Sequence, residues 1–230
     1  MLFPFYDPTM LLLIPAIILT IYAQGKISAT FNKYAKVRSA SGYSGAQIAR
    51  RLLDQNGLYD VQVKSVSGKL SDHYDPRTQV VSLSQEVYNG TSIAAIGVAA
   101  HETGHAVQHA DAYAPFNMRA TIVPVASLGS SLAPWLIIIG FVMAYYQLIL
   151  VGVVAFAAVV LFQLITLPVE FNASRRAIAF LGNGYLEGAE LQGAHKVLNA
   201  AALTYVAAAL TAVLTLLRFI LLANAGRRND

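Results

Sequence analysis

Four long apolar runs divide the chain. They cover residues 10–23, 121–143, 147–167 and 200–222. A helix needs about 20 apolar residues to cross a hydrocarbon layer of about 30 Å, so each run predicts one transmembrane helix. The first run is short enough to require tilt or local thinning of the bilayer. It also lacks the basic start and the small-residue cleavage site of a signal peptide, which predicts a retained helix. The second and third runs predict a hairpin that turns near residues 145–147.

The most polar stretch lies between the first two apolar runs, over residues 25–119. Within it, Ser44 is suited to cap a helix that ends at Asn56-Gly57. Two segments with alternating apolar residues, 61–66 and 79–84, predict strands. This stretch is therefore expected to fold into a small α+β part.

The segment between the two strands, residues 72–77, has the unusually polar sequence DHYDPR. Because Asp and Pro favour turns, the segment predicts a turn. It is either a solvated loop or a loop that directs one of its side chains toward an active site. A second helix then begins at Thr91 or Ser92, either of which can serve as its N-cap, and continues to about residue 109.

Beyond the hairpin, Pro168 is suited to the first turn of a further helix. Residues 187–198 predict another helical piece before the last apolar run. The predicted fold is thus a mainly α membrane protein with about four transmembrane helices and a small α+β part. Its expected segments are an N-terminal transmembrane helix (1–24), the α+β part (25–119), a transmembrane hairpin (120–167), two further helices (168–199), and a C-terminal transmembrane helix with a tail (200–230).

Composition supports a membrane protein. Hydrophobic residues make up 56% of the 230 residues and charged residues only 12%, whereas soluble domains carry about 25% charged residues. The net charge of +4 is modest, and no pattern of a nucleic-acid-binding module is present, so nucleic acid is not an expected partner. The lipid bilayer is the expected partner instead. The chain has no cysteine, so any transition metal must be held by histidine and carboxylate groups.

Basic residues beside the apolar runs indicate the orientation. They follow the first run and flank the hairpin: Lys26, Lys33, Lys36, Arg38, Arg119, Arg175 and Arg176. Under the positive-inside rule these flanks are cytoplasmic, which predicts a multi-pass protein of the cell membrane. Arg227 and Arg228 follow the last run and conflict with the rule. A re-entrant or tilted last helix would remove that conflict.

The second helix of the polar stretch contains the motif His101-Glu102-x-x-His105. Positions i and i+4 lie roughly 40° apart around a helix axis, so the two imidazoles project from one face and fit two corners of a tetrahedral zinc site. Glu102 is displaced from that face but can reach a water molecule at the metal. The alternative is a buried helix whose histidines are satisfied by carbonyl groups.

A catalytic zinc site needs a third protein ligand. A metzincin-type site is excluded, because the residue six positions after His105 is Asp111 rather than histidine. Glu170 is the strongest candidate, since the hairpin brings the end of its second helix back to the histidine helix. Glu170 could instead form a salt bridge with Arg175 or Arg176. His109 and Asp111 are the rival ligands.

The motifs DHYDP, HETGHAVQHA and LPVEFNASRRA, in this order, resemble those of the YugP-type neutral zinc metallopeptidases of bacteria. The order of strand, HExxH helix, transmembrane hairpin and Glu-x-x-Ala is also similar to that of the HtpX-type membrane metallopeptidases. The resemblance implies a zincin-like cytoplasmic part, Zn²⁺ held by His101, His105 and Glu170, and a catalytic Glu102. The HtpX-type pattern usually has Asp four residues after the ligand Glu, where this chain has Ser174, a weaker group for orienting a ligand histidine.

These observations predict a membrane-embedded, zinc-dependent endopeptidase with its active site on the cytoplasmic side, acting on peptide or protein substrates that include membrane-associated ones. Glu102 is expected to move the proton of a metal-activated water. His73 or Tyr74 is expected to stabilise the oxyanion, and the strand at 79–84 to pair with extended substrate. The alternatives are a non-catalytic zinc-binding scaffold, which would not need Glu102, and a small transporter, whose spans would need more polar groups.

Overall fold

The computed structural model describes residues 8–227, which form two compact units. Within the described residues, the apolar unit comprises residues 8–22, 118–167 and 205–227. The polar unit comprises Ala23–Asn117 and Pro168–Thr204. Two distant parts of the chain therefore build the polar unit, and the predicted hairpin is the segment that separates them along the sequence.

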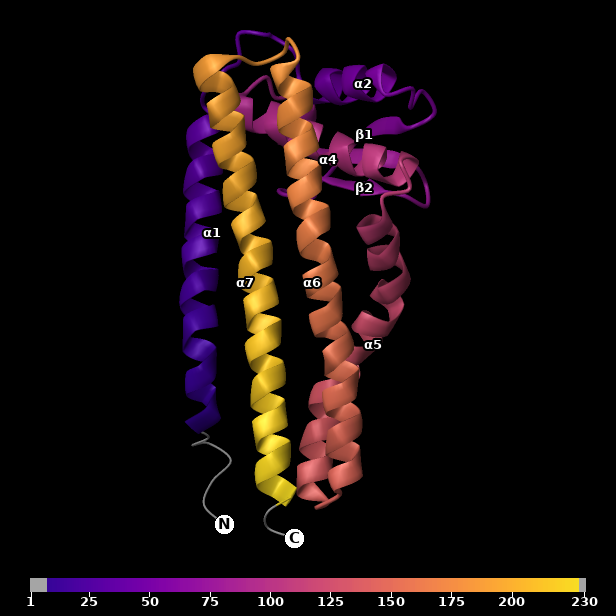
Figure 1. Ribbon diagram of the computed structural model, residues 1–230. Coiled ribbons are helices and arrows are strands. Elements are labelled where there is room, and N and C mark those ends of the chain that lie inside the picture. Colours follow the sequence, from indigo (N-terminus) through magenta and orange to yellow (C-terminus); the bar gives the residue numbers. More distant parts are fainter. Residues whose placement is uncertain (1–7, 228–230) are drawn as a thin grey trace. The chain divides into compact units, whose positions relative to one another are not determined.

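The four predicted transmembrane helices are confirmed as four long helices with the length and apolar composition to cross a membrane (Figure 1). They are α1 (Ile14–Tyr34), preceded by a 3₁₀ turn at Pro8–Leu13, then α5 (Ala114–Val142), α6 (Tyr146–Gly182) and α7 (Gly188–Arg227). The fold class, a mainly α membrane protein with a small sheet, is confirmed with them.

The helices are longer than the apolar runs that predicted them. Pro168 lies inside α6, so the prediction that it begins a new helix is wrong. A proline removes one helical hydrogen bond, and helices of membrane proteins accommodate this loss through neighbouring groups. The helical piece at 187–198 and the last apolar run are likewise one helix, α7, because no glycine or proline separates them. Its uninterrupted course also rules out a re-entrant last segment within the described residues.

The polar unit contains a three-stranded sheet in the order β1 (Gln62–Val66), β3 (Val80–Ser84), β2 (His73–Asp75). β1 pairs with β3 in parallel, and β2 pairs with β3 antiparallel. β3 is fully buried and central. Its predicted pairing with substrate is therefore wrong, because both of its edges are already used. The free edges within the described chain belong to β1 and β2.

The polar segment predicted as a turn contains the strand β2. Its carboxylates explain why so polar a sequence forms a strand. Asp72 accepts a hydrogen bond from the backbone N–H of Ser84 at 2.7 Å, which ties the start of β2 to the end of β3. Asp75 accepts from the backbone N–H of Arg77 at 2.9 Å and so closes the turn that follows β2. This contact is the main reason that the pKa of Asp75 lies below its ordinary value.

Three helices complete the N-terminal part of the polar unit: α2 (Gly45–Gln55), α3 (Gln85–Asn89) and α4 (Ile93–Ala110). The predicted caps are confirmed. Ser44 forms a capping box with Gln47, and the Ser92 side chain accepts from the backbone N–H of Ala95. Nearly every residue of α4 is buried. One face contributes to a core with the sheet and α2, and a second face to a core with α2, α6 and α7.

Small residues let α4 approach its neighbours closely. A Cβ atom placed on Gly104 would lie 2.8 Å from the backbone oxygen of Ala173 in α6. One placed on Gly97 would lie 3.6 Å from the Cβ of Ala194 in α7, an ordinary contact. The α4–α6 contact at Gly104 is thus too tight for any side chain, whereas the α4–α7 contact is not.

This difference generates a test. Alanine in an unhindered helix is more stable than glycine by up to about 1 kcal/mol, so Gly25→Ala in α1, where nothing lies within 4 Å, should leave stability unchanged or raise it. Gly104→Ala should instead destabilise the protein by about 1–3 kcal/mol, because backbone must move to admit the methyl group. Thermal unfolding in detergent, followed by circular dichroism, measures both. Equal effects of the two substitutions would contradict the close contact.

Candidate metal centre

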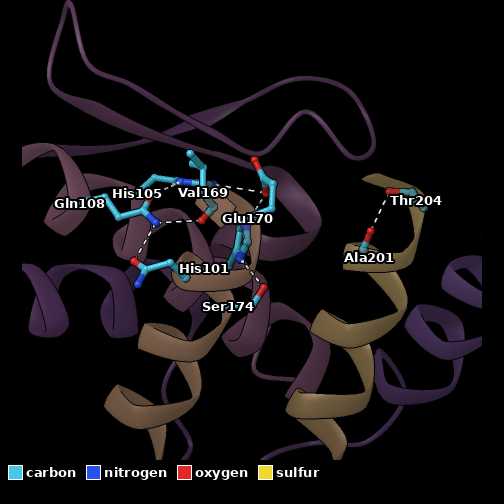
Figure 2. A network of polar contacts seen from close by, with 9 residues as sticks. His101, His105, Gln108, Val169, Glu170, Ser174, Ala201 and Thr204 are labelled. Carbon is cyan, nitrogen blue, oxygen red and sulfur yellow. Dashed lines mark hydrogen bonds and ion pairs between the residues drawn. The ribbon is translucent and has the colours of Figure 1, made fainter. Parts of the chain in front are cut away.

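His101 and His105 lie one turn apart on α4 and face Glu170 on α6 (Figure 2). The Nε2 atom of His101 is 3.2 Å from Oε2 of Glu170, and the Nε2 atom of His105 is 3.6 Å from the same oxygen. One ligand atom from each residue lies within 4.8 Å of the others. Among the described residues, the structure brings together the three that the sequence analysis selected as ligands.

These distances fit zinc. Two zinc–ligand bonds of about 2.1 Å at a tetrahedral angle separate their donor atoms by about 3.4 Å. Two imidazole nitrogens and one carboxylate oxygen also form a donor set typical of catalytic zinc sites. The rings of His101 and His105 are nearly perpendicular, at 85°, with centroids 4.7 Å apart. The residues present therefore fit a zinc ion without rearrangement of the helices.

Glu102 is buried beside this group. Burial raises its pKa to about 7, while the neighbouring His101 lowers it and Glu170 and Asp72 raise it further. A carboxyl group with a pKa near neutrality can both accept and return a proton. Glu102 thus combines a position next to the metal-ligand group with the chemistry of a general base.

Gln108, one turn after His105, fixes the orientation of that histidine. Its Oε1 atom lies 2.9 Å from Nδ1 of His105. Its Nε2 atom donates to the backbone oxygen of Val169 at 2.8 Å and to Oδ1 of Asn172 at 2.9 Å. Because both amide hydrogens are used in this way, Oε1 must accept from Nδ1–H of His105. The lone pair of His105 is then on Nε2, the atom that faces Glu170.

The contacts continue from Asn172 to the surface. Asn172 Oδ1 also accepts from Nε of Arg176 at 2.9 Å, and Arg176 forms an ion pair of 2.6 Å with Asp111. Arg176 therefore binds both Asp111 and Asn172. We refer to Gln108, Asn172, Arg176 and Asp111 as the amide relay, since its two amide side chains connect the histidine to the ion pair.

His101 has its own partner in Ser174. The serine Oγ lies 3.2 Å from Nδ1 of His101, as expected for a group that orients a ligand histidine (Figure 2). The rival ligands lie outside the group. His109 Nδ1 is 2.9 Å from the hydroxyl of Tyr74, and Asp111 belongs to the amide relay. Burial raises the pKa of Tyr74, so its phenol remains a neutral partner for His109.

His73, the residue expected to stabilise an oxyanion, lies exposed on β2. Its Nδ1 atom is 2.8 Å from the backbone oxygen of Ser71. The His73 ring is near enough to Glu102 to lower the pKa of that carboxyl group. Tyr74, the other candidate, points to the opposite side of the strand and is buried.

The sequence analysis missed the function of Gln108 and Asn172. In the sequence, Gln108 stands within the motif HETGHAVQHA and received no role of its own. Its position three residues after His105, on the same face of the helix, is a signal that could have found it. Asn172 carries no such signal, because its role depends on where α6 passes α4.

Comparisons with known proteins agree with this geometry. Residues 9–224 match the model of a family described as "Putative neutral zinc metallopeptidase". The chain is 51% identical over 217 residues to "Putative membrane protease YugP" of Bacillus subtilis (strain 168), with 94% of this chain and 96% of the relative covered. No solved structure gives a significant match. A family match over nearly the whole chain, together with a relative sharing half of its residues, shows that the chain belongs to the neutral zinc metallopeptidase family, whose cofactor is Zn²⁺.

Proposed function

We propose that the protein is a membrane-embedded, zinc-dependent endopeptidase in which His101, His105 and Glu170 hold the metal and Glu102 is the general base. The observation that carries this proposal is the group of three ligand atoms with a buried carboxyl group beside it. A purely structural zinc site is normally closed by four protein ligands. Three ligands and an adjacent acid instead favour catalysis over the scaffold alternative.

Bound zinc would supply a Lewis acid that polarises the scissile carbonyl and makes an attacking water more acidic. Glu102 takes the proton of that water as it attacks the carbonyl carbon. Glu102 then returns the proton to the nitrogen of the leaving amine, so the carboxyl group is regenerated as the peptide bond breaks. Burial keeps bulk water away from this proton and strengthens each electrostatic contact within the site.

Two groups on β2 complete the proposal. The exposed His73 imidazole is the candidate donor to the oxyanion that forms at the carbonyl oxygen. The backbone of β2 offers an unpaired edge to an extended substrate, which replaces β3 as the substrate strand. A peptide paired there would run beside His73, so substrate binding and oxyanion stabilisation would involve the same strand.

The polar unit is proposed to lie on the cytoplasmic side of the cell membrane. The basic residues near α1 and near the ends of the hairpin support this orientation. The proposed substrates are peptides or proteins that reach this side, including membrane-associated ones.

Glu102 and Glu170 can be distinguished by measuring zinc and activity together. Glu102→Gln leaves all three proposed ligands, so it should retain zinc and lose at least about 100-fold in peptide hydrolysis. Glu170→Ala removes one ligand, so it should lose both. Chelator competition measures zinc affinity, and a quenched fluorescent peptide measures hydrolysis. Unchanged zinc affinity in Glu170→Ala would mean that the third ligand lies elsewhere.

The amide relay makes a second prediction. Gln108→Leu keeps the volume of the side chain but removes the acceptor for His105 Nδ1–H, so zinc affinity should fall about 10- to 100-fold. Gln55→Leu, which removes an exposed contact to Tyr185, is the matched control and should bind zinc as the wild type does. Circular dichroism at saturating zinc verifies that both variants fold. Wild-type zinc affinity in Gln108→Leu would remove Gln108 from the site.

The orientation is testable by labelling, because the natural chain has no cysteine. Single cysteines at the exposed positions Ser67 and Asn183 of the polar unit should resist an impermeant thiol reagent in intact cells. A cysteine at Gln147, at the start of α6, should react. All three should react in opened membranes, which controls for accessibility. The reverse pattern in intact cells would place the polar unit outside the cell.

A further inference from the structure

A pocket of about 310 Å³ in the polar unit lies between α1 and the start of β2, beside the end of β3. Its lining comes from two parts of the chain that are distant in sequence: Ile27, Ser28 and Phe31 are on α1, and Leu70, Asp72 and Ser84 are near the strands. We refer to this feature as the α1 pocket.

The α1 pocket borders the candidate metal centre. Asp72, in its wall, directly precedes His73, the proposed oxyanion donor at the start of β2. β2 in turn lies against the histidine helix, because the Tyr74 hydroxyl is 2.9 Å from Nδ1 of His109. The Asp72 carboxylate is also close enough to Glu102 to raise the pKa of that carboxyl group. The pocket therefore lies beside the proposed catalytic groups.

Apolar side chains line both walls of the α1 pocket. Ile27 and Phe31 are four residues apart on α1, so they share one face of that helix, and both are half-buried. Leu70 reaches the pocket from the loop between β1 and β2. An apolar group that entered the pocket would thus meet apolar side chains from two sides.

The charged groups of the lining do not favour a charged ligand. Asp72 accepts hydrogen bonds from the backbone N–H and the hydroxyl group of Ser84, at 2.7 and 3.2 Å, so its carboxylate holds the wall together. Lys69 and Glu86 are exposed and carry opposite charges. Because the lining does not gather one sign of charge, apolar contact is what the pocket offers a ligand.

Leu70 has an unusual backbone conformation. Its φ of 55° lies in the left-handed region, which is rare for a residue with a large side chain. The side chain is also 73% exposed, so the folded chain gains little from burying it. Strained backbone of this kind gathers at ligand-binding sites. A ligand that covered Leu70 would remove apolar surface from water, which is favourable.

A substrate paired with β2 would reach this pocket. The outer edge of β2 is free within the described chain, and neighbouring residues of a strand are about 3.3 Å apart. The scissile carbonyl is proposed to lie at His73, so a substrate residue level with Asp72 is within about two positions of the scissile bond. A volume of about 310 Å³ is at the small end of ligand pockets, which suits one side chain.

We propose that the α1 pocket is the specificity pocket of the peptidase. It receives a large apolar side chain, of the size of leucine or phenylalanine, from a substrate residue within about two positions of the scissile bond. Ile27 and Phe31 contact this side chain from α1, and Leu70 covers it from the loop. This role rests on the proposed endopeptidase function and adds the class of residue beside which the chain is cut.

Two substitutions to aspartate test Leu70. Leu70→Asp places a charge at the pocket, and aspartate adopts the left-handed conformation more readily than leucine, so the loop keeps its course. Tyr59→Asp is the matched control, because Tyr59 is 72% exposed and is absent from the lining. Quenched fluorescent peptides with leucine, phenylalanine or alanine at each position around the scissile bond give kcat/KM for the full-length, zinc-loaded proteins in detergent.

Wild type and Tyr59→Asp should cleave the leucine or phenylalanine peptide at least about tenfold better than the alanine peptide at one position. Leu70→Asp should reduce this ratio to about threefold or less while binding zinc like the wild type, which shows that it is folded. An unchanged ratio in Leu70→Asp, or no apolar preference in the wild type, would overturn the pocket assignment and leave the endopeptidase proposal intact.

The opposite wall is tested by a second pair of variants. Ser28→Phe fills the pocket from α1, whereas Ala29→Phe places the same ring on another face of that helix. Only Ser28→Phe should lose the preference for the large apolar residue. Equal loss in both variants would show that the change acts on α1 as a whole and would contradict the pocket.

A binding measurement separates the pocket from catalysis. The Glu102→Gln protein is irradiated with peptides that carry benzoylphenylalanine at each position in turn, and mass spectrometry maps the crosslinks. They should fall on residues 27–31 or on Leu70. These crosslinks without any hydrolysis by the wild type would refute the endopeptidase proposal but retain the pocket as a binding site for apolar side chains. Crosslinks elsewhere, or none, would overturn the pocket itself.

Discussion

The close contact between Gly104 of α4 and Ala173 of α6 is the constraint on which the site depends. Gly104 lies between the two histidines of the HExxH motif, and Ala173 lies between Glu170 and Ser174. When the backbones meet at these two residues, Glu170 reaches both imidazoles and Ser174 reaches the far nitrogen of His101. A side chain at position 104 would separate the helices and lengthen each of these distances. Gly104 is therefore as necessary to the geometry of the candidate site as the two histidines on either side of it.

Buried polar groups in this region are all satisfied. Among the described residues, no buried side-chain nitrogen or oxygen lacks a hydrogen-bond partner. Gln108 is completely buried, and an amide in that position would be costly if its bonds were unmade. The amide relay and Ser174 hold one histidine each, so the two imidazoles are oriented before a metal arrives. This preorganisation reduces the entropy that zinc binding must overcome.

Periodicity and motif spacing predicted the elements that depend on local sequence. The four spans, the caps at Ser44 and Ser92, and the two strands around β2 follow from residue pattern alone. The strand β2 was predicted as a turn, because Asp72 and Asp75 favour turns until their carboxylates are used by backbone groups distant in sequence. Pro168 was read as a helix start for a similar reason. Proline is favoured in the first turn of a helix, but at Pro168 the residues on both sides continue one helix, α6.

The candidate site divides along the same line. The five-residue HExxH motif is enough to predict His101 and His105 as ligands and Glu102 as the base. Glu170 could be predicted because the hairpin brings the end of its second helix back to the histidine helix. The roles of Gln108 and Asn172 could not be predicted from the sequence. Their hydrogen bonds depend on which residues of α6 lie against α4, and the sequence does not give that packing. The same limitation applies to β3, whose alternating pattern gave a strand but not its central place in the sheet.

The arrangement of the ligands along the chain also bears on biogenesis. The partners His101 and Glu170 are 69 residues apart, and the whole transmembrane hairpin lies between them. A nascent chain that has been synthesised only as far as the hairpin carries the proposed base and two of the proposed ligands, but lacks the third. Only after the ribosome has made both spans and α6 has returned to α4 can the three donors converge. A chain that ends within the hairpin therefore lacks the third proposed ligand, and the proposed metal centre can be completed only after the whole hairpin has been made.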